Sequence, residues 1–308
     1  MSLYFNCLGM YNYSLIRVSL DLRLKTLSGE VLPPLILTLV LWLFIFNLSR
    51  GLVLLEPVAP IVVVEEPAGA PPTSPAPYIN TITLLSIIAV TGFTFFLIFK
   101  RYPRLASYIS VGAFWTVSFL TLLIHIGYIG NVSAIIGENL ILGIVLVIAT
   151  ALAFLVRKSS GVAALAAACV TAGAGGTIIG YMIPVLTFIV LVASLTVFDL
   201  VMVKKGYLSL LSHEQYRERI NQLRGLVVEV GDVNIGLGDL LFYTITVTTT
   251  FFKLGLLPAI TANLAMIIGY YLTLQLLKKW TTVPGLTIPL SLALASALAV
   301  YAFIPQVH

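Results

Sequence analysis

Long apolar runs separated by short polar breaks dominate this sequence. An apolar stretch of about 18 or more residues is long enough to cross a bilayer as an α-helix. Nine such stretches occur, and we predict a transmembrane helix for each: residues 32–55, 79–99, 105–128, 133–156, 161–180, 183–203, 236–257, 258–277 and 284–303. The pattern predicts an all-α polytopic membrane protein with about nine transmembrane helices.

The composition agrees with this pattern. Of the 308 residues, 59% are hydrophobic and only 9% are charged, and the mean hydropathy is +1.06. Soluble domains carry about 25% charged residues, so a water-soluble fold of this composition would expose more apolar surface than stays in solution. The composition therefore excludes a soluble enzyme. Residues 32–55 are too long for the apolar part of a signal peptide, so we expect a retained span.

The basic residues fall on alternate loops. Of the 17 Lys and Arg residues, only Arg50 and Lys253 lie outside the N-terminal tail and the second, fourth, sixth and eighth loops. Because cytoplasmic loops are enriched in Lys and Arg, we predict a protein of the cell membrane with its N-terminus in the cytoplasm and its C-terminus outside. Topology thus explains the net charge of +5, and we predict no nucleic-acid partner.

The spans divide the chain into three parts. Residues 1–31 form a cytoplasmic tail, residues 32–180 a bundle of spans one to five, and residues 181–308 a bundle of spans six to nine. Residues 56–78 contain seven prolines, three acids and no base, which indicates an extended external linker. Residues 204–235 form the longest cytoplasmic loop.

The cytoplasmic segments contain further short elements. Alternating apolar and polar residues over 16–25 indicate a strand in the tail. In the long loop, Ser212 opens a capping-box pattern typical of a short helix that runs to about Arg224. Leu226–Val230 then predicts a short cytoplasmic strand before the seventh span, and we expect residues 232–236 to be a flexible link.

Three acidic residues fall inside the predicted spans, namely Glu138, Asp199 and Asp239. An ionisable group in hydrocarbon costs several kcal/mol and is a candidate functional group; the alternative is a protonated Asp that only packs helices together. Asp199 lies five residues before Lys204, and Asp239 lies seven residues after Asp232. Both carboxyl groups are therefore roughly 8–10 Å from the same membrane edge, on consecutive antiparallel helices.

Two carboxyl groups at one depth are what aspartic proteolysis requires. Close together they cannot both ionise, so they share a proton. The carboxylate takes a proton from water while the carboxylic acid polarises the scissile carbonyl group. Candidate substrate contacts flank the two acids on spans six, seven and nine: Phe198, Gly236, Leu237, Gly238, Pro284, Gly285 and Leu286.

These motifs resemble those of the presenilin and signal peptide peptidase family of intramembrane aspartic proteases. That family carries Tyr-Asp on its sixth span, Gly-x-Gly-Asp on its seventh and Pro-Ala-Leu at its ninth. Here the matches are Phe198-Asp199, Gly236 to Asp239, and Pro284 to Leu286. The resemblance implies an endopeptidase in which Asp199 and Asp239 hydrolyse peptide bonds within or near the transmembrane helices of other membrane proteins. The expected topology matches presenilins and is opposite to that of signal peptide peptidases.

The sequence departs from this family at three positions. Phe198 replaces the usual Tyr, Gly285 replaces the usual Ala, and Thr287 stands where presenilins often have a second Pro. Gly285 and Thr287 leave the small, helix-breaking character of the region in place. An alternative register at Pro289-Leu290 stays open.

A helical substrate has to unwind before it is cut, and its freed backbone groups then need partners. We predict that the substrate adds as a strand beside Leu226–Val230, centred on Val228. On the other side, Pro284 lacks an N–H group, which leaves backbone groups near Gly285 and Leu286 free to bind substrate.

We predict no metal and no cofactor, because the three histidines and two cysteines form no ligand cluster.

The alternative functions are an ion-coupled secondary transporter, a prepilin-peptidase-type aspartic protease, or a membrane protein without catalytic activity. No repeat relates the two halves, which disfavours the transporter. Leu240 to Phe242 follow Asp239, where prepilin peptidases typically carry a lysine. The expected partners are transmembrane-helix substrates and the lipid bilayer; the sequence does not define an oligomeric state.

Other polar and small residues have structural explanations. Ala172, Gly176 and Gly180 form a small-residue stripe for close helix packing. The threonines of the seventh span either bond to their own helix or line a hydrated cavity. His125 and Glu138 lie near the outer ends of neighbouring predicted spans, where they could pair; a structural contact is favoured over an ion path.

Overall fold

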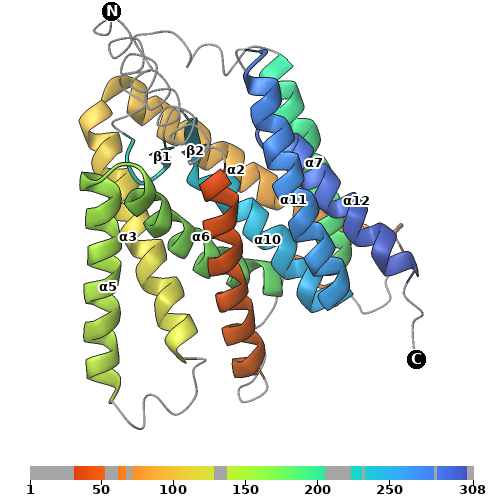
Figure 1. The fold of residues 1–308 in the computed structure, drawn as a ribbon, viewed down its shortest axis with the longest axis horizontal. Helices are drawn as coiled ribbons and strands as arrows, with labels where there is room; N and C mark the ends of the chain where they lie inside the picture. Colours follow the sequence, from red (N-terminus) through yellow and green to blue (C-terminus); the bar gives the residue numbers. More distant parts are fainter. Residues whose placement is uncertain are drawn as a thin grey trace, which may run out of the picture.

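The computed structural model describes residues 31–52, 62–66, 71, 73–127, 137–204, 223–230, 233–280 and 283–303. These ranges contain nine helices and one two-stranded sheet (Figure 1): the N-terminal helix Val31–Leu52, α2 (Ala76–Arg101), α3 (Pro103–Gly127), α5 (Glu138–Lys158), α6 (Val162–Met182), α7 (Val185–Lys204), β1 (Val227–Val230), β2 (Val233–Gly236), α10 (Leu237–Leu254), α11 (Leu256–Leu277) and α12 (Thr287–Phe303). The strand predicted over 16–25 lies outside the described residues, as does the helix predicted from Ser212 except at its end, where Leu223 and Arg224 are not helical.

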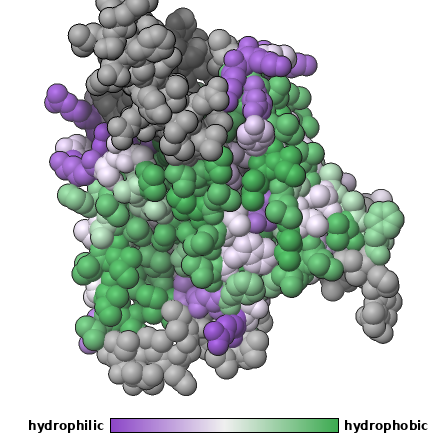
Figure 2. Space-filling model, viewed as in Figure 1, coloured by the Kyte–Doolittle hydropathy of each residue, from purple (hydrophilic) through white to green (hydrophobic). Residues whose placement is uncertain are grey.

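The nine helices of the described chain correspond one to one with the nine predicted spans, so the fold class is confirmed. Seven of them are long and apolar enough to cross a membrane by length and composition. The other two are α10, which carries Asp239, Lys253 and five threonines, and α12, which has only 17 residues. Figure 2 shows a surface dominated by hydrophobic residues with hydrophilic patches toward its ends. The protein is a multi-pass integral membrane protein.

Helices α6 and α10 form the centre of the bundle. On one side of α6 lie α3 and α5, while α10 also packs against α11, α12 and α7, as Figure 1 shows. The α6–α10 contact is close because of two glycines. A Cβ atom on Gly176 would lie 2.6 Å from Cβ of Thr244, and one on Gly180 would lie 2.9 Å from the carbonyl oxygen of Ile245. The predicted packing role of the small-residue stripe is confirmed.

The strand predicted at Leu226–Val230 is confirmed as β1, but the flexible link expected over 232–236 is wrong. Val233–Gly236 forms β2, which pairs antiparallel with β1 and places Val228 opposite Ile235. Alternation explains the strand, because Ile235 is buried in the core while Asn234 is exposed. In the sequence, the pair Gly231-Asp232 between two short apolar runs is typical of a hairpin turn and could have predicted the second strand.

Candidate active site

The two acidic residues occupy opposite ends of their helices. Asp199 lies five residues before the last residue of α7, Lys204, and Asp239 is the third residue of α10. Strand β2 leads directly into α10, since Gly236 keeps an extended conformation (φ −73°, ψ 136°) and the helix begins at the next residue. The hairpin therefore fixes the start of α10 and, with it, the position of Asp239.

Asp199 caps a helix that is distant in sequence. One carboxylate oxygen, Oδ2, accepts hydrogen bonds from the backbone N–H groups of Leu286 (2.8 Å) and Thr287 (3.1 Å). The hydroxyl group of Thr287 lies 3.2 Å from the same oxygen. Because α12 begins at Thr287, these N–H groups have no partner within their own helix. A carboxylate is a strong acceptor for them.

Asp239 reaches the same turn from α10. A Cβ atom on Gly285 would lie 3.4 Å from Oδ2 of Asp239, and one on Gly236 would lie 3.3 Å from the same oxygen. At Gly236 the missing side chain lets the backbone approach the carboxyl group closely, whereas at Gly285 an added Cβ atom would be in ordinary contact with it. The two carboxyl groups thus converge on residues 285–287.

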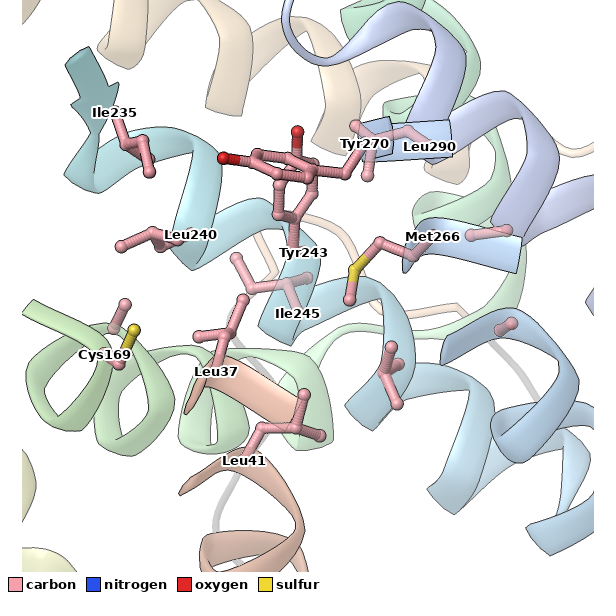
Figure 3. Close-up of a cluster of buried hydrophobic side chains, with 14 of the residues drawn as sticks. Leu37, Leu41, Cys169, Ile235, Leu240, Tyr243, Ile245, Met266, Tyr270 and Leu290 are labelled. Carbon is pink, nitrogen blue, oxygen red and sulfur yellow. The ribbon is translucent and has the colours of Figure 1, made fainter. Parts of the chain in front are cut away.

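Tyr243 contacts this turn as well, and sequence reasoning did not select it. Its hydroxyl group donates a hydrogen bond to the carbonyl oxygen of Gly285 at 2.9 Å, and its side chain is almost fully buried. Figure 3 shows Tyr243 beside Tyr270, with Leu240 one turn away and Met266 and Leu290 nearby. The available signal was spacing: Tyr243 follows Asp239 by four residues, which puts both on one face of α10.

The contacts at the start of α12 distinguish between the two candidate segments, Pro284 to Leu286 and Pro289-Leu290. The groups that contact Asp199 belong to Leu286 and Thr287. Pro289 instead packs inside the bundle, where a Cβ atom on Gly269 would lie 2.5 Å from its Cα atom, and Leu290 is fully buried. Pro284 to Leu286 is therefore the segment next to the acids.

Two backbone groups of this segment that were expected to be free have partners within the protein. The N–H group of Leu286 binds Asp199, and the carbonyl group of Gly285 binds Tyr243. These two backbone groups are not free for a substrate in this structure. The reason is tertiary: Pro284 does break the helix, but α7 and α10 supply partners for the groups that the break releases.

The other predicted substrate contacts are spread around the acids. Phe198 is exposed, with 47% of its surface accessible, and a Cβ atom on Gly238 would meet no other group within 4 Å. Leu237 is half-buried and donates its N–H group to the carbonyl oxygen of Leu226 at 2.8 Å. Pro284 is half-buried, and Val228 is buried in β1.

Of the two outer edges of the hairpin, that of β1 is paired with another part of the bundle. The Leu237–Leu226 bond and the register together direct the backbone groups of Val228 and Ile235 toward each other. The backbone groups of Glu229 and Asn234 therefore point away from the hairpin. The carbonyl group of Glu229 accepts a bond from Gly161 N–H at 3.0 Å. Among the described residues, the backbone of Asn234 has no such partner.

The remaining polar candidates have structural roles. His125 is buried and contacts Asn47, Thr177 and the carbonyl oxygen of Ala174. These are structural contacts, and Glu138, with which it could have paired, is exposed. Three buried threonines of α10 donate to carbonyl groups of their own helix, namely Thr244, Thr246 and Thr250. The helix-bonding explanation holds for these three. No group of three or more potential metal ligands occurs within the described ranges.

Comparison with known proteins identifies the fold. No protein-family model and no curated protein matches this chain. Two solved structures, each titled as a presenilin family intramembrane aspartate protease, match it over 88% of its length and over 98% and 97% of theirs. The TM-scores are 0.60 and 0.58, at 17% and 18% sequence identity. The chain has the presenilin fold. The architecture expected from the motifs is thereby confirmed.

Proposed function

We propose that this presenilin-fold protein is an intramembrane aspartic endopeptidase. Its substrates would be membrane proteins, cut within or near their transmembrane helices. The observation that carries this proposal is the convergence of Asp199 from α7 and Asp239 from α10 on one turn, residues 285–287. Costly acidic groups in a membrane bundle, brought together in this way, favour catalysis over a purely structural role.

The proposed reaction uses both carboxyl groups and one water molecule. The ionised carboxylate removes a proton from water, and the resulting hydroxide attacks the scissile carbonyl carbon while the second carboxyl group donates a proton to the carbonyl oxygen. The diol intermediate then collapses as the C–N bond breaks: the leaving nitrogen receives the proton that the first carboxylate took from water, and the second carboxylate takes a proton back from one hydroxyl group of the diol. No metal ion is required, because the acid and the base supply the proton transfers.

The hydrogen bonds suggest how the two acids divide these roles. An ionised carboxylate only accepts hydrogen bonds, and Oδ2 of Asp199 faces two N–H donors and a hydroxyl group. We therefore assign the charge to Asp199, which acts as the base, and the shared proton to Asp239, which acts as the acid.

We also propose that the unwound substrate adds as a strand to the hairpin. The sequence suggested the β1 side, around Val228. We now favour the outer edge of β2, at Asn234, because Gly161 already binds the outer edge of β1. Val228 then supports this site from within the hairpin, through its pairing with Ile235. Strand addition supplies partners for backbone groups that the substrate helix has released.

The positive-inside rule supports one orientation of the protein in the membrane. Basic residues end the helices α2, α5 and α7, at Arg101, Lys158 and Lys204. We propose that these ends, the hairpin and both acids lie toward the cytoplasm of the cell, with the C-terminus outside.

The deciding experiment measures cleavage of a single-span reporter by purified protein in detergent or vesicles. Asp199→Asn and Asp239→Asn are each expected to abolish cleavage without unfolding the bundle. The matched control is Glu138→Gln, which removes an exposed acid at the start of α5 and should leave the rate unchanged. Substantial turnover by either Asp variant would rule out the dyad.

Strand addition has a separate test. Asn234→Pro removes the outward N–H group of β2, whereas Asn234→Ala keeps it. We expect the proline variant to cleave the reporter much more slowly than the alanine variant. Equal rates from two folded proteins would show that this edge does not bind substrate.

A further inference from the structure

The hydroxyl group of Thr287 lies between two acceptors. It is 3.2 Å from Oδ2 of Asp199 and 3.2 Å from the carbonyl oxygen of Thr196, both on α7. A hydroxyl group carries one hydrogen and rotates to suit its surroundings. At equal distances, the stronger acceptor takes that hydrogen.

We infer that Thr287 is a positioning residue whose hydroxyl group follows the charge of Asp199 during the reaction. When Asp199 is a carboxylate, the hydroxyl group donates to it, because ionised acceptors form the stronger hydrogen bonds. When Asp199 has taken a proton from water, the hydroxyl group turns to the carbonyl oxygen of Thr196. This inference rests on the proposed function, which requires Asp199 to gain and lose a proton in each cycle.

The other two donors to Asp199 cannot turn in this way. The N–H groups of Leu286 and Thr287 are fixed by the backbone at the start of α12. They hold the carboxyl group against the turn in either state, whereas the hydroxyl group adds a bond that is strongest in the charged state. When Asp199 loses its charge, the Thr287 hydroxyl group can still donate its hydrogen bond to the carbonyl oxygen of Thr196. It is therefore not left unpaired in the membrane interior.

The contact between Thr287 and Asp199 also connects the start of α12 to α7, next to the two acids. Thr287 is the first residue of α12, and its side chain and backbone both bind Asp199. The position of this carboxyl group relative to Asp239 therefore depends on Thr287. Small displacements of reacting groups reduce rates strongly.

The kinetic test compares two substitutions at one site. Thr287→Val keeps the branched shape but loses the hydroxyl group, while Thr287→Ser keeps the hydroxyl group. We expect Thr287→Val to lower kcat about tenfold with KM unchanged, and Thr287→Ser to restore most of that loss. Thr116→Val serves as the control, since that hydroxyl group is exposed and binds only its own helix. Equal kcat for the valine variant and wild type would overturn the inference while leaving the proposed function intact.

A second measurement does not depend on activity. Thermal unfolding of Thr287→Val, Asp199→Ala and the double variant forms a double-mutant cycle. If the hydroxyl group binds Asp199, the decrease in Tm caused by Thr287→Val is smaller when Asp199 is already alanine. Additive changes in Tm would refute the contact. A wild-type preparation that cleaves no reporter would refute the proposed function, and the cycle would still decide whether Thr287 holds Asp199.

Discussion

The hydroxyl group of Tyr243 donates a hydrogen bond to the carbonyl oxygen of Gly285 at 2.9 Å. Tyr243 lies on α10, one helical turn after Asp239, and Gly285 lies just before α12. Asp199, on α7, binds the next two residues of the same turn. The turn before α12 is therefore held by both helices that carry the candidate acids, so its conformation and theirs are coupled.

Removing the Tyr243 hydroxyl group is expected to lower both stability and activity. Tyr243→Phe leaves the carbonyl group of Gly285 without its partner, and a lost buried hydrogen bond costs about 1 kcal/mol. We expect a lower Tm and slower cleavage of the reporter. Tyr271→Phe is the control, because that hydroxyl group is on an exposed residue and accepts a bond only from Gln275. A Tyr243→Phe variant with wild-type Tm and rate would show that the bond has no role.

The space at Gly285 predicts which side chains the turn accepts. The closest atoms to an added Cβ would be Oδ2 of Asp239 at 3.4 Å and its Cγ at 3.8 Å, which is ordinary contact. Gly285→Ala should therefore keep its Tm and cleave within a few-fold of the wild-type rate. Gly285→Val adds two methyl groups against the carboxyl group, and we expect cleavage to be lost. An inactive alanine variant would mean that the turn moves during the reaction.

Close packing between α6 and α10 predicts a stability effect that hydropathy alone does not. Gly180→Ala places a methyl group 2.9 Å from a backbone oxygen of α10, and overpacking of this kind costs about 1–3 kcal/mol. Gly143→Ala on α5 is the matched control, since its Cβ would meet no other group within 4 Å. Thermal unfolding should show a clear decrease in Tm for the first variant and little change for the second. Equal Tm values would contradict the close contact.

Glu66 is expected to stabilise the N-terminal end of α7. Its carboxylate accepts hydrogen bonds from the N–H groups of Leu186 and Thr187 and from the Thr187 hydroxyl group. Losing a carboxylate at a helix start costs about 0.5–2 kcal/mol, so Glu66→Ala should lower the Tm. Glu65→Ala removes the neighbouring exposed acid and should not. The same decrease for both variants would assign the effect to net charge rather than to capping.

The sequence by itself determined the spans and the level of the two acids. Spans follow from local composition, because a helix in lipid satisfies its own backbone and needs only enough apolar residues to cross. Depth follows from counting residues along a helix of known rise. The strand at Val227–Val230 was also local, since a short run of β-branched residues bounded by glycines marks it.

Only the tertiary structure decided which groups meet. Asp199 and Thr287 are 88 residues apart, and Tyr243 and Gly285 are 42 apart; hydropathy contains no information on how helices rotate and cross. That arrangement depends on close contacts such as Gly180 with Ile245. For the same reason the backbone groups of Gly285 and Leu286, which a broken helix start leaves unpaired, have partners here. Their pairing depends on helices α7 and α10, whose positions no local pattern specifies.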